Sequence, residues 1–386
     1  MTPSRGSTLL LALATASILV QCGKTGSVQS AAGPTPAAAP SAPPAAATAR
    51  YRTVTVVDRE GIGLEAFRLL APADWQAEGG VRWVLDNPLQ PAIVDFRVRN
   101  PQGREEVQVF PNQACFWSNN PTVMSLHPPG RKYFGCEVRK PVTAAEALRT
   151  VVIPRFRGDV SGLKVVSGEE MPDVAKQVAA ASPAFNHPAS AAKVRVEYTG
   201  GGAAMEEEIY AVVEGFSYPV QTMAGPVTHT NWFVDYIVSF KAEKGRLDNQ
   251  AKAFQSIVRS FKVNPKWFNA YGQIVEALIR QKTQQIKATG EVGRMAARTS
   301  SEISDQRMKD WQARQAVNDR VVDDFCRGIR GVDLYRNPYE DKPVELPSGY
   351  GNAWVSRGGE YILTESPSFN PNVGSNVEWT RIEPTR

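Results

Sequence analysis

The stretch from Pro265 to Gly328 most constrains what this chain can fold into. It has no internal proline, few aromatics and many Gln, Lys, Arg and Glu, and it separates a strand-rich region from a tail rich in Gly, Pro and aromatics. Its first part carries apolar residues at spacings of four, three and four, which places them on one face of a helix. These residues are Trp267, Tyr271, Ile274 and Leu278. We expect the stripe to pack on the preceding domain and residues 265–328 to form a helical arm.

The arm is not expected to be uniform along its length. Gly290 and Gly293 lie in a polar middle section, and each glycine costs about 1 kcal/mol inside a helix. A bend or break near Gly290 is therefore predicted. If it were wholly helical, the arm would extend about 90 Å. A solvent-spanning helix and a partner-binding coiled coil are the two alternatives, and the apolar heptads are not sustained.

The N-terminus has the pattern of an export signal. Arg5 precedes an apolar run from Leu9 to Val20, which is too short to span a bilayer well. The following Leu19-Val20-Gln21-Cys22 resembles the bacterial lipoprotein box, which implies a lipid anchor on Cys22 and a place in the cell envelope, facing the periplasm or the cell surface. Gln21 departs from the Gly, Ala or Ser of that box, so cleavage after Ser30 is the alternative.

These features divide the N-terminal part into a signal at residues 1–22 and a spacer at residues 23–50. The spacer is rich in Ala and Pro, cannot form a core and is expected to be flexible. Among the remaining cysteines, Cys115 and Cys136 could form a disulfide in an oxidising compartment. Closing that loop would stabilise the fold by about 3 kcal/mol. Cys326 is then either a buried thiol or an intermolecular disulfide partner.

Residues 51–264 read as a domain of eight or nine strands and three helices. Alternating runs such as Ile93 to Val98 predict strands, and Thr143 with Glu146 predicts a helix start. The segment from Asn112 to Pro129 is expected to be a loop, and the run 206–208, three glutamates, to be solvated. The fold class that follows is α+β, with helices covering a largely antiparallel sheet in a sandwich.

Two parts of this domain carry a family resemblance. The run from Phe67 to Trp75, an apolar strand followed by Pro72, a turn and Trp75, resembles the opening of the PsbP/Mog1-like sandwich. The run from Tyr236 to Phe240, followed by a helix over residues 251–259, is similar to the last strand and final helix of that family. The resemblance implies an adaptor or assembly module and transfers no functional residues.

Residues 329–386 are expected to form a small β-rich module. Strands are predicted near residues 332–335, 344–346, 353–356 and 361–364, with turns between them. The segment resembles the C-terminal tails of uncharacterised bacterial lipoproteins, and we expect it to dock on the arm or on the sandwich. Its aromatics are either the core of the module or a ligand face for sugars or peptides. The candidate binding residues are Tyr335, Tyr350, Trp354 and Tyr361.

The sequence offers no catalytic residue, metal site or cofactor motif that we would select. Its three histidines, His127, His187 and His229, lack metal-ligand spacing. A net charge of +5 without a basic stripe argues against nucleic acid. We therefore expect an exported, lipid-anchored envelope protein with a binding or scaffolding role rather than an enzyme, whose partner is an envelope protein, a peptide or a glycan. A cell-wall or periplasmic hydrolase is one alternative, and a glycan- or peptide-binding module using the C-terminal aromatics is the other.

Overall fold

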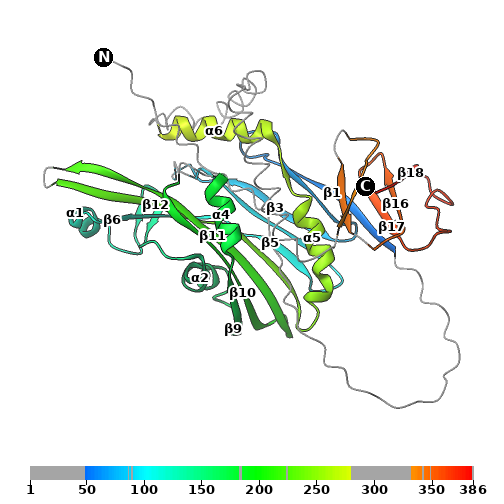
Figure 1. The fold of residues 1–386 in the computed structure, drawn as a ribbon, viewed down its shortest axis with the longest axis horizontal. Coiled ribbons are helices and arrows are strands. Elements are labelled where there is room, and N and C mark those ends of the chain that lie inside the picture. The colour runs from blue at the N-terminus through cyan, green and yellow to red at the C-terminus, as the bar shows by residue number, and fades with distance from the viewer. Residues whose placement is uncertain are drawn as a thin grey trace, which may run out of the picture.

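The computed structural model describes residues 48–85, 87, 90–181, 185–222, 225–279, 332–340, 343–347 and 349–384 (Figure 1). The strands are β1 (Thr48–Val57), β2 (Glu65–Pro72), β3 (Gln76–Trp83), β4 (Ala92–Arg99), β5 (Glu106–Val109), β6 (Gln113–Ser118), β7 (Lys132–Tyr133), β8 (Cys136–Val138), β9 (Ser161–Glu170), β10 (His187–Gly200), β11 (Ala203–Thr222), β12 (Gly225–Glu243), β13 (Lys262–Val263), β14 (Val332–Tyr335), β15 (Val344–Pro347), β16 (Asn352–Ser356), β17 (Glu360–Thr364) and β18 (Trp379–Ile382). The helices are α1 (Pro121–Leu126), α2 (Ala144–Ala147), the π-helix η1 (Leu148–Val152), α3 (Ile153–Phe156), α4 (Pro172–Ala181), the 3-10 helix η2 (Asp248–Gln250), α5 (Ala251–Arg259) and α6 (Pro265–Ile279).

A ten-stranded sheet forms the body of the protein. Its main order is β3-β4-β5-β12-β11-β10-β9. In addition, β6 pairs with β12, β8 pairs with β6, and β7 pairs with β8. The described strand pairs are antiparallel except for β6 with β8. The strands β11 and β12 are long, and their hairpin projects from one end of the molecule (Figure 1). The expected α+β class with a largely antiparallel sheet is confirmed.

Both faces of this sheet are covered, which explains why the central strands carry apolar residues on both sides. On one face, α2, η1 and α3 pack on alternate side chains of β10 and β11, with Leu148, Val194 and Ile209 almost fully buried. On the other face, α4, α5, α6 and the hairpin β1–β2 enclose the larger core, which includes Val212, Phe240 and Phe254. Two buried layers therefore share one sheet.

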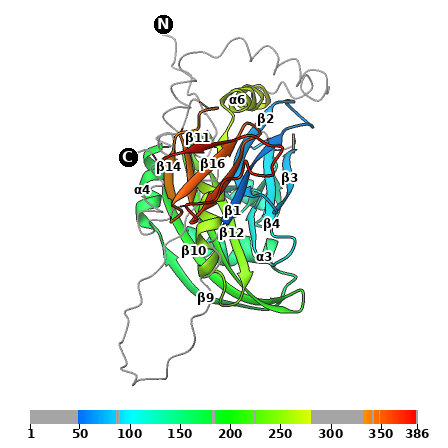
Figure 2. The same ribbon diagram turned by 90° about the vertical axis from the view of Figure 1, so that its right-hand side faces the viewer.

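The second sheet joins the two ends of the chain. Its order is β13-β2-β1-β17-β16-β18, and β1 pairs with β17 through Tyr51 and Tyr361. Figure 2 shows the blue strands β1 and β2 close to the orange strand β16. The four strands predicted after residue 329 are present as β14 to β17. Three of the C-terminal strands extend the sheet begun by β1, and β14 and β15 form a separate pair. The C-terminal segment thus completes a sheet with the first strands.

Helix α6 confirms the beginning of the predicted arm. Trp267, Tyr271, Ile274 and Leu278 are all at most 2% exposed and lie in the larger core, as the spacing predicted. The remainder of the predicted arm, residues 280–328, lies outside the described residues, and so do Gly290, Gly293 and Cys326. Its predicted length and break stay predictions.

The expected loop from Asn112 to Pro129 is wrong. Residues 113–118 form β6, which pairs with β12 over Val234 to His229, and residues 121–126 form α1. The many Asn and Pro residues of this segment end and cap these elements instead of preventing them. Asn120 is the N-cap of α1, and Pro121 occupies its first turn, where the missing N–H removes no hydrogen bond.

Candidate binding surface

A chain of aromatic rings lies at the projecting end of the β11–β12 hairpin. Tyr218 and His229 face each other across the two strands, with ring centroids 5.7 Å apart. Phe116 of β6 continues the chain, 5.3 Å from His229. Further contacts extend it at both ends. We call this set the aromatic surface, although Phe116 and Phe216 are themselves buried, at 2% and 6% exposure. Its members are Phe116, Tyr133, Phe134, Phe185, Phe216, Tyr218 and His229.

The short helix α1 holds one side of this end. The Asn120 side chain accepts hydrogen bonds from the backbone N–H groups of Thr122 and Val123, at 2.9 and 3.4 Å. The segment before the helix is tied to β12, because Asn119 Oδ1 accepts from the N–H of Thr228 at 2.7 Å. The helix ends at Leu126, whose side chain is 72% exposed. A large apolar side chain is therefore displayed at a fixed position.

The turn between β7 and β8 displays a second apolar side chain. Tyr133 pairs with Cys136, so Phe134 and Gly135 form a two-residue turn, with φ values of 47° and 80°. Positive φ at both positions is the pattern of a type I′ turn, which favours Asn-Gly. A bulky residue in this region costs about 1 kcal/mol, and Phe134 is also 71% exposed. Folding alone does not account for Phe134.

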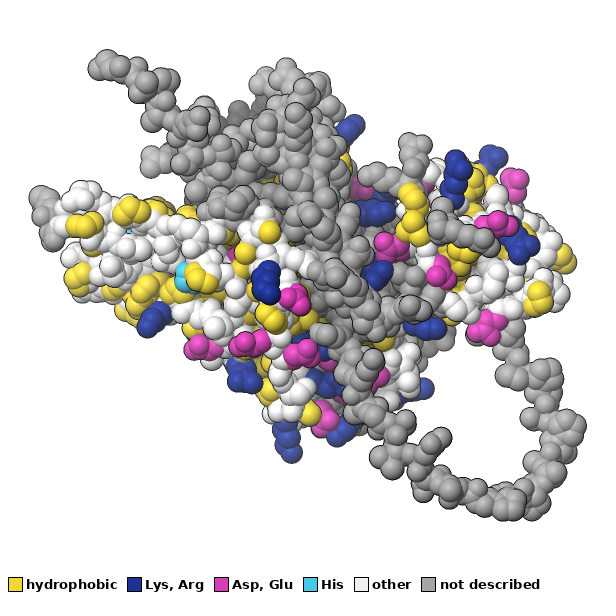
Figure 3. Space-filling model, viewed as in Figure 1, with side chains coloured by type: hydrophobic (Ala, Val, Ile, Leu, Met, Phe, Trp, Pro, Cys, Tyr) yellow, Lys and Arg dark blue, Asp and Glu magenta, His cyan; other side chains and the backbone are white. Residues whose placement is uncertain are grey.

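Charge is unevenly distributed around the aromatic surface. Residues 215–234, which include the end of the hairpin, contain no Asp, Glu, Lys or Arg. Burial lowers the pKa of His229 from its usual value, so this imidazole is neutral at pH 7. Hydrophobic side chains gather over this end in Figure 3, and charged ones are sparse there. The end is therefore almost free of charge and exposes several hydrophobic side chains.

Cationic residues flank the apolar end. Arg131, Lys132 and Lys140 are exposed, and within the described part of the chain neither Arg131 nor Lys132 forms an ion pair. The nearby carboxylate, Glu137, is bound by Arg139 and Arg155 at 2.8 and 2.6 Å. Burial would raise the pKa of Glu137, but these two guanidinium groups hold it below its usual value. The uncompensated charge beside the aromatic surface is therefore positive.

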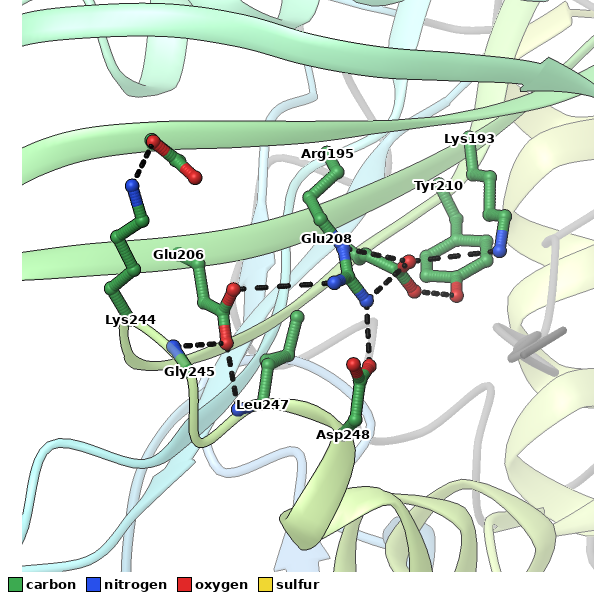
Figure 4. A network of polar contacts seen from close by, with 10 residues as sticks. Lys193, Arg195, Glu206, Glu208, Tyr210, Lys244, Gly245, Leu247 and Asp248 are labelled. Carbon is green, nitrogen blue, oxygen red and sulfur yellow. Dashed lines mark hydrogen bonds and ion pairs between the residues drawn. The ribbon is translucent and has the colours of Figure 1, made fainter. Parts of the chain in front are cut away.

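The three glutamates expected to be solvated are buried, at 7%, 0% and 6% exposure for Glu206, Glu207 and Glu208. Arg195 lies among Glu206, Glu208 and Asp248 (Figure 4). Its guanidinium nitrogen is 3.1 Å from a carboxylate oxygen of Glu208 and 2.7 Å from one of Asp248. On the opposite face of the sheet, Glu207 is held by Arg157. These carboxylates join strands to loops and helices, and nothing in their spacing along the sequence indicates it.

Two further buried carboxyl groups lie beneath α6. Glu214 and Asp235 are each 1% exposed, and they share one face of β11 and β12 in diagonal register. Burial, and then the neighbouring Glu214, raises the pKa of Asp235 well above its usual value. The register shifts beside them, where Tyr236 has a φ of 53°. The alternation of β12 predicted a strand here but not the bulge.

The predicted disulfide between Cys115 and Cys136 is wrong, since both are free and buried. The strands β6 and β8 run parallel, and Cys115 is opposite Glu137. Successive side chains of a strand point to opposite faces, so Cys136 points away from Cys115. Accordingly, Cys115 lies in the core beneath α2, and Cys136 packs with Phe116 on the other face. A disulfide needs Cβ atoms that point toward each other.

The C-terminal aromatics divide into two groups. Tyr335 and Tyr361 are 2% and 1% exposed and belong to the core between the second sheet and β14–β15, so they present no face to a ligand. Tyr350 and Trp354 are partly exposed. The expected ligand platform is therefore reduced to these two, and the predicted lipidation site, Cys22, lies outside the described residues.

The signal that could have located the aromatic surface is local. The uncharged run 215–234 and the Phe134-Gly135 pair are both visible in the sequence. Their proximity was not predicted, because residues 112–129 were expected to be a loop. The hairpin end, α1 and the β7–β8 turn come together only because β6 pairs with β12.

Comparisons with known proteins add little to this geometry. No family model matches the chain, and no curated protein matches it. Among solved structures, LpqN of Mycobacterium tuberculosis, described as involved in cell envelope biogenesis, matches with a TM-score of 0.24 and 10% identity, covering 56% of this chain and 92% of that one. At this TM-score the similarity supports no statement about role. No helix among the described residues is long and apolar enough to cross a membrane.

Proposed function

We propose that this chain is an exported, lipid-anchored protein of the bacterial envelope that acts by binding, with the aromatic surface as its contact site. The observation that carries the proposal is Phe134, which is both strained and exposed. The exposed Leu126 belongs to the same end, because its neighbour His127 contacts Tyr133, the neighbour of Phe134, with ring centroids 4.8 Å apart. A positive φ strains the backbone, and an exposed aromatic ring leaves apolar surface in water. Both are typical of residues at binding sites. The end of the hairpin, residues 215–234, adds a segment without charged residues to the same part of the molecule.

A PsbP/Mog1-like sandwich is part of the same proposal. Its support is the order of the elements that carry the resemblance: β2 ends at Pro72, where the N–H of Trp75 bonds to the carbonyl of Pro72 at 3.0 Å. Later, β12 leads to α5 over Ala251–Arg259. That family contains adaptor and assembly modules, which agrees with a binding role.

The lipid anchor is tested by intact mass and fractionation of the native protein beside a Cys22→Ala variant. A diacylated or triacylated Cys22, lost together with membrane association in the variant, is the expected result. A soluble product beginning at Ala31 would remove the anchor from the proposal. The spacer can reach about 85 Å when extended, at roughly 3.4 Å for each of the residues 23–47. An anchored chain could therefore turn its aromatic surface toward a range of envelope partners.

The contact site is tested with the exported chain from Gly23 onward, which lacks the lipid but keeps every described residue. This chain is sedimented with washed native envelopes, and the Tyr218→Ala and Phe134→Asn variants are expected to sediment less. Val373→Asn is the matched control, because Val373 is 80% exposed on the C-terminal segment. Equal sedimentation of all four proteins would reject the aromatic surface as the contact site.

A further inference from the structure

The composition of the projecting end indicates what it contacts. Two apolar side chains, Leu126 and Phe134, are more than 70% exposed, and Tyr218 is exposed at 37%. A protein surface that serves only solubility avoids such groups, while a surface that enters a lipid interface needs them. Aromatic rings are favoured at the headgroup level of a bilayer.

The charges around this end restrict the partner further. Residues 119–140 contain four cationic residues and one carboxylate, and that carboxylate, Glu137, is bound by two arginines. Arg131 and Lys132 stand between Leu126 and Phe134 in the chain and are both exposed. Long cationic side chains can lie along an apolar surface while their charged groups reach phosphate. Anionic lipids attract such residues.

We propose that the aromatic surface docks on an anionic lipid bilayer, with Leu126 and Phe134 entering the interface and Arg131 and Lys132 contacting the headgroups. This inference rests on the proposed function, since it names the partner of the same site. It is separate from the lipid anchor, because it predicts membrane contact by a chain that carries no lipid. The β7–β8 turn would hold Phe134 in a fixed position at its tip. A flexible loop would instead lose conformational entropy when it became ordered on binding.

The decisive variant is Phe134→Asn. Asn-Gly is a preferred sequence for a type I′ turn, so this change removes the ring and relieves the strain together. The variant is expected to be at least as thermally stable as the parent chain, and its binding to lipid is expected to fall about tenfold, in line with the loss of one buried aromatic side chain. A loss of binding in a more stable protein cannot be attributed to unfolding.

The experiment measures co-sedimentation of the chain from Gly23 onward with protein-free vesicles of phosphatidylcholine alone or with 30% phosphatidylglycerol. We expect binding to the anionic vesicles, weaker binding to the neutral ones, and loss of binding in high salt. Arg131→Gln and Lys132→Gln should each reduce binding roughly fivefold on the anionic vesicles. The control Val373→Asn should bind like the parent chain.

A second measurement, tryptophan fluorescence, reports how deeply position 134 enters the bilayer. Relative to the parent chain, which has eight tryptophans, Phe134→Trp should add emission that shifts to shorter wavelength on vesicles and is quenched by brominated lipids. Val373→Trp should show neither change. The inference is overturned if the parent chain ignores anionic vesicles, or if Phe134→Asn binds them equally well. If the parent chain then still sediments with native envelopes through Tyr218, the partner is a protein or glycan, and the proposed function stands without the lipid inference.

Discussion

Trp267 on α6 donates a hydrogen bond from its indole nitrogen to Oδ2 of Asp58, at 2.8 Å, across 209 positions of the chain. Asp58 is fully buried and lies in the turn after β1. Its carboxylate also accepts from the indole of Trp83 and from the N–H groups of Gly61 and Ile62. A single carboxylate thus joins the β1–β2 turn, the end of β3 and the first turn of α6.

Asp58→Ala should therefore destabilise the protein by about 3 kcal/mol, because it leaves several buried donors without an acceptor. The free energy of unfolding in urea measures this effect. Asp74→Ala is the control, since Asp74 is exposed in the next turn and its replacement should change stability by less than about 0.5 kcal/mol. Similar values for the two variants would show that the carboxylate does not hold these elements together.

The sequence predicted the apolar side of this arrangement better than its polar side. The stripe from Trp267 to Leu278 follows from helical spacing alone. The hydrogen bond between Asp58 and Trp267 does not, because local patterns cannot place residues so distant in the sequence. The same reason explains the buried glutamates: Glu207 is bound by Arg157, 50 residues away, and no periodicity connects them.

For the aromatic surface too, local patterns were predictable from the sequence and long-range contacts were not. The run from Tyr236 to Phe240 predicted a strand within β12, but the projecting ends of β11 and β12, residues 215–230, were not predicted. The strands of the C-terminal segment were predicted. The aromatic surface depends on β6 pairing with β12 and on the Phe134 turn, which needs a positive φ that sequence rules assign to Asn or Gly. Pairing between strands far apart in the sequence decides which aromatic side chains are buried. Tyr361, for example, is buried because β17 pairs with β1.

The ion pair between Arg157 and Glu207 should contribute much more than a surface pair. Glu207 is fully buried and contacts the guanidinium of Arg157 at 2.7 Å. Burial would raise the pKa of Glu207, but Arg157 holds it below its usual value. Arg157→Met should cost about 3–5 kcal/mol, because it leaves a buried carboxylate without a counter-ion.

The matched control for that ion pair is Arg50→Met. Arg50 pairs with Glu360 at 3.2 Å, with side chains 56% and 37% exposed, and exposed pairs contribute at most about 1 kcal/mol. Urea unfolding of both variants at pH 7 compares them directly. Equal losses would mean that water or another cation reaches Glu207 once Arg157 is removed.

The carboxyl pair beneath α6 should make stability fall as pH rises. The pKa of Asp235 is raised, so the folded protein keeps a proton that the unfolded chain releases above a pKa of about 3.9. The free energy of unfolding therefore decreases with increasing pH from that value until the folded-state pKa is reached, by up to about 1.4 kcal/mol per pH unit. The contribution is complete below the unfolded pKa and lost above the folded one.

Asp235→Asn removes this dependence while keeping nearly the same shape. The difference in free energy of unfolding between the parent and the variant, measured from pH 4 to pH 9, should shift in favour of the variant as pH rises. Glu207 contributes with the opposite sign in both proteins and cancels in the difference. A difference that is flat over this range would show that Asp235 carries no extra proton in the fold.

Cys115 and Cys136 should behave as two unreactive thiols, even if the chain is exported as we propose. Burial raises the pKa of both, that of Cys136 to about 12, and the thiolate is the reactive form. A Cys22→Ser/Cys326→Ser variant isolates the pair. In the folded protein at pH 8 it should react with Ellman's reagent very slowly, and after denaturation without reductant it should release two equivalents. A protein that releases no thiol after denaturation contains the disulfide. In that case the register of β6 and β8 would have to differ from the one in this fold, where Cys115 is opposite Glu137.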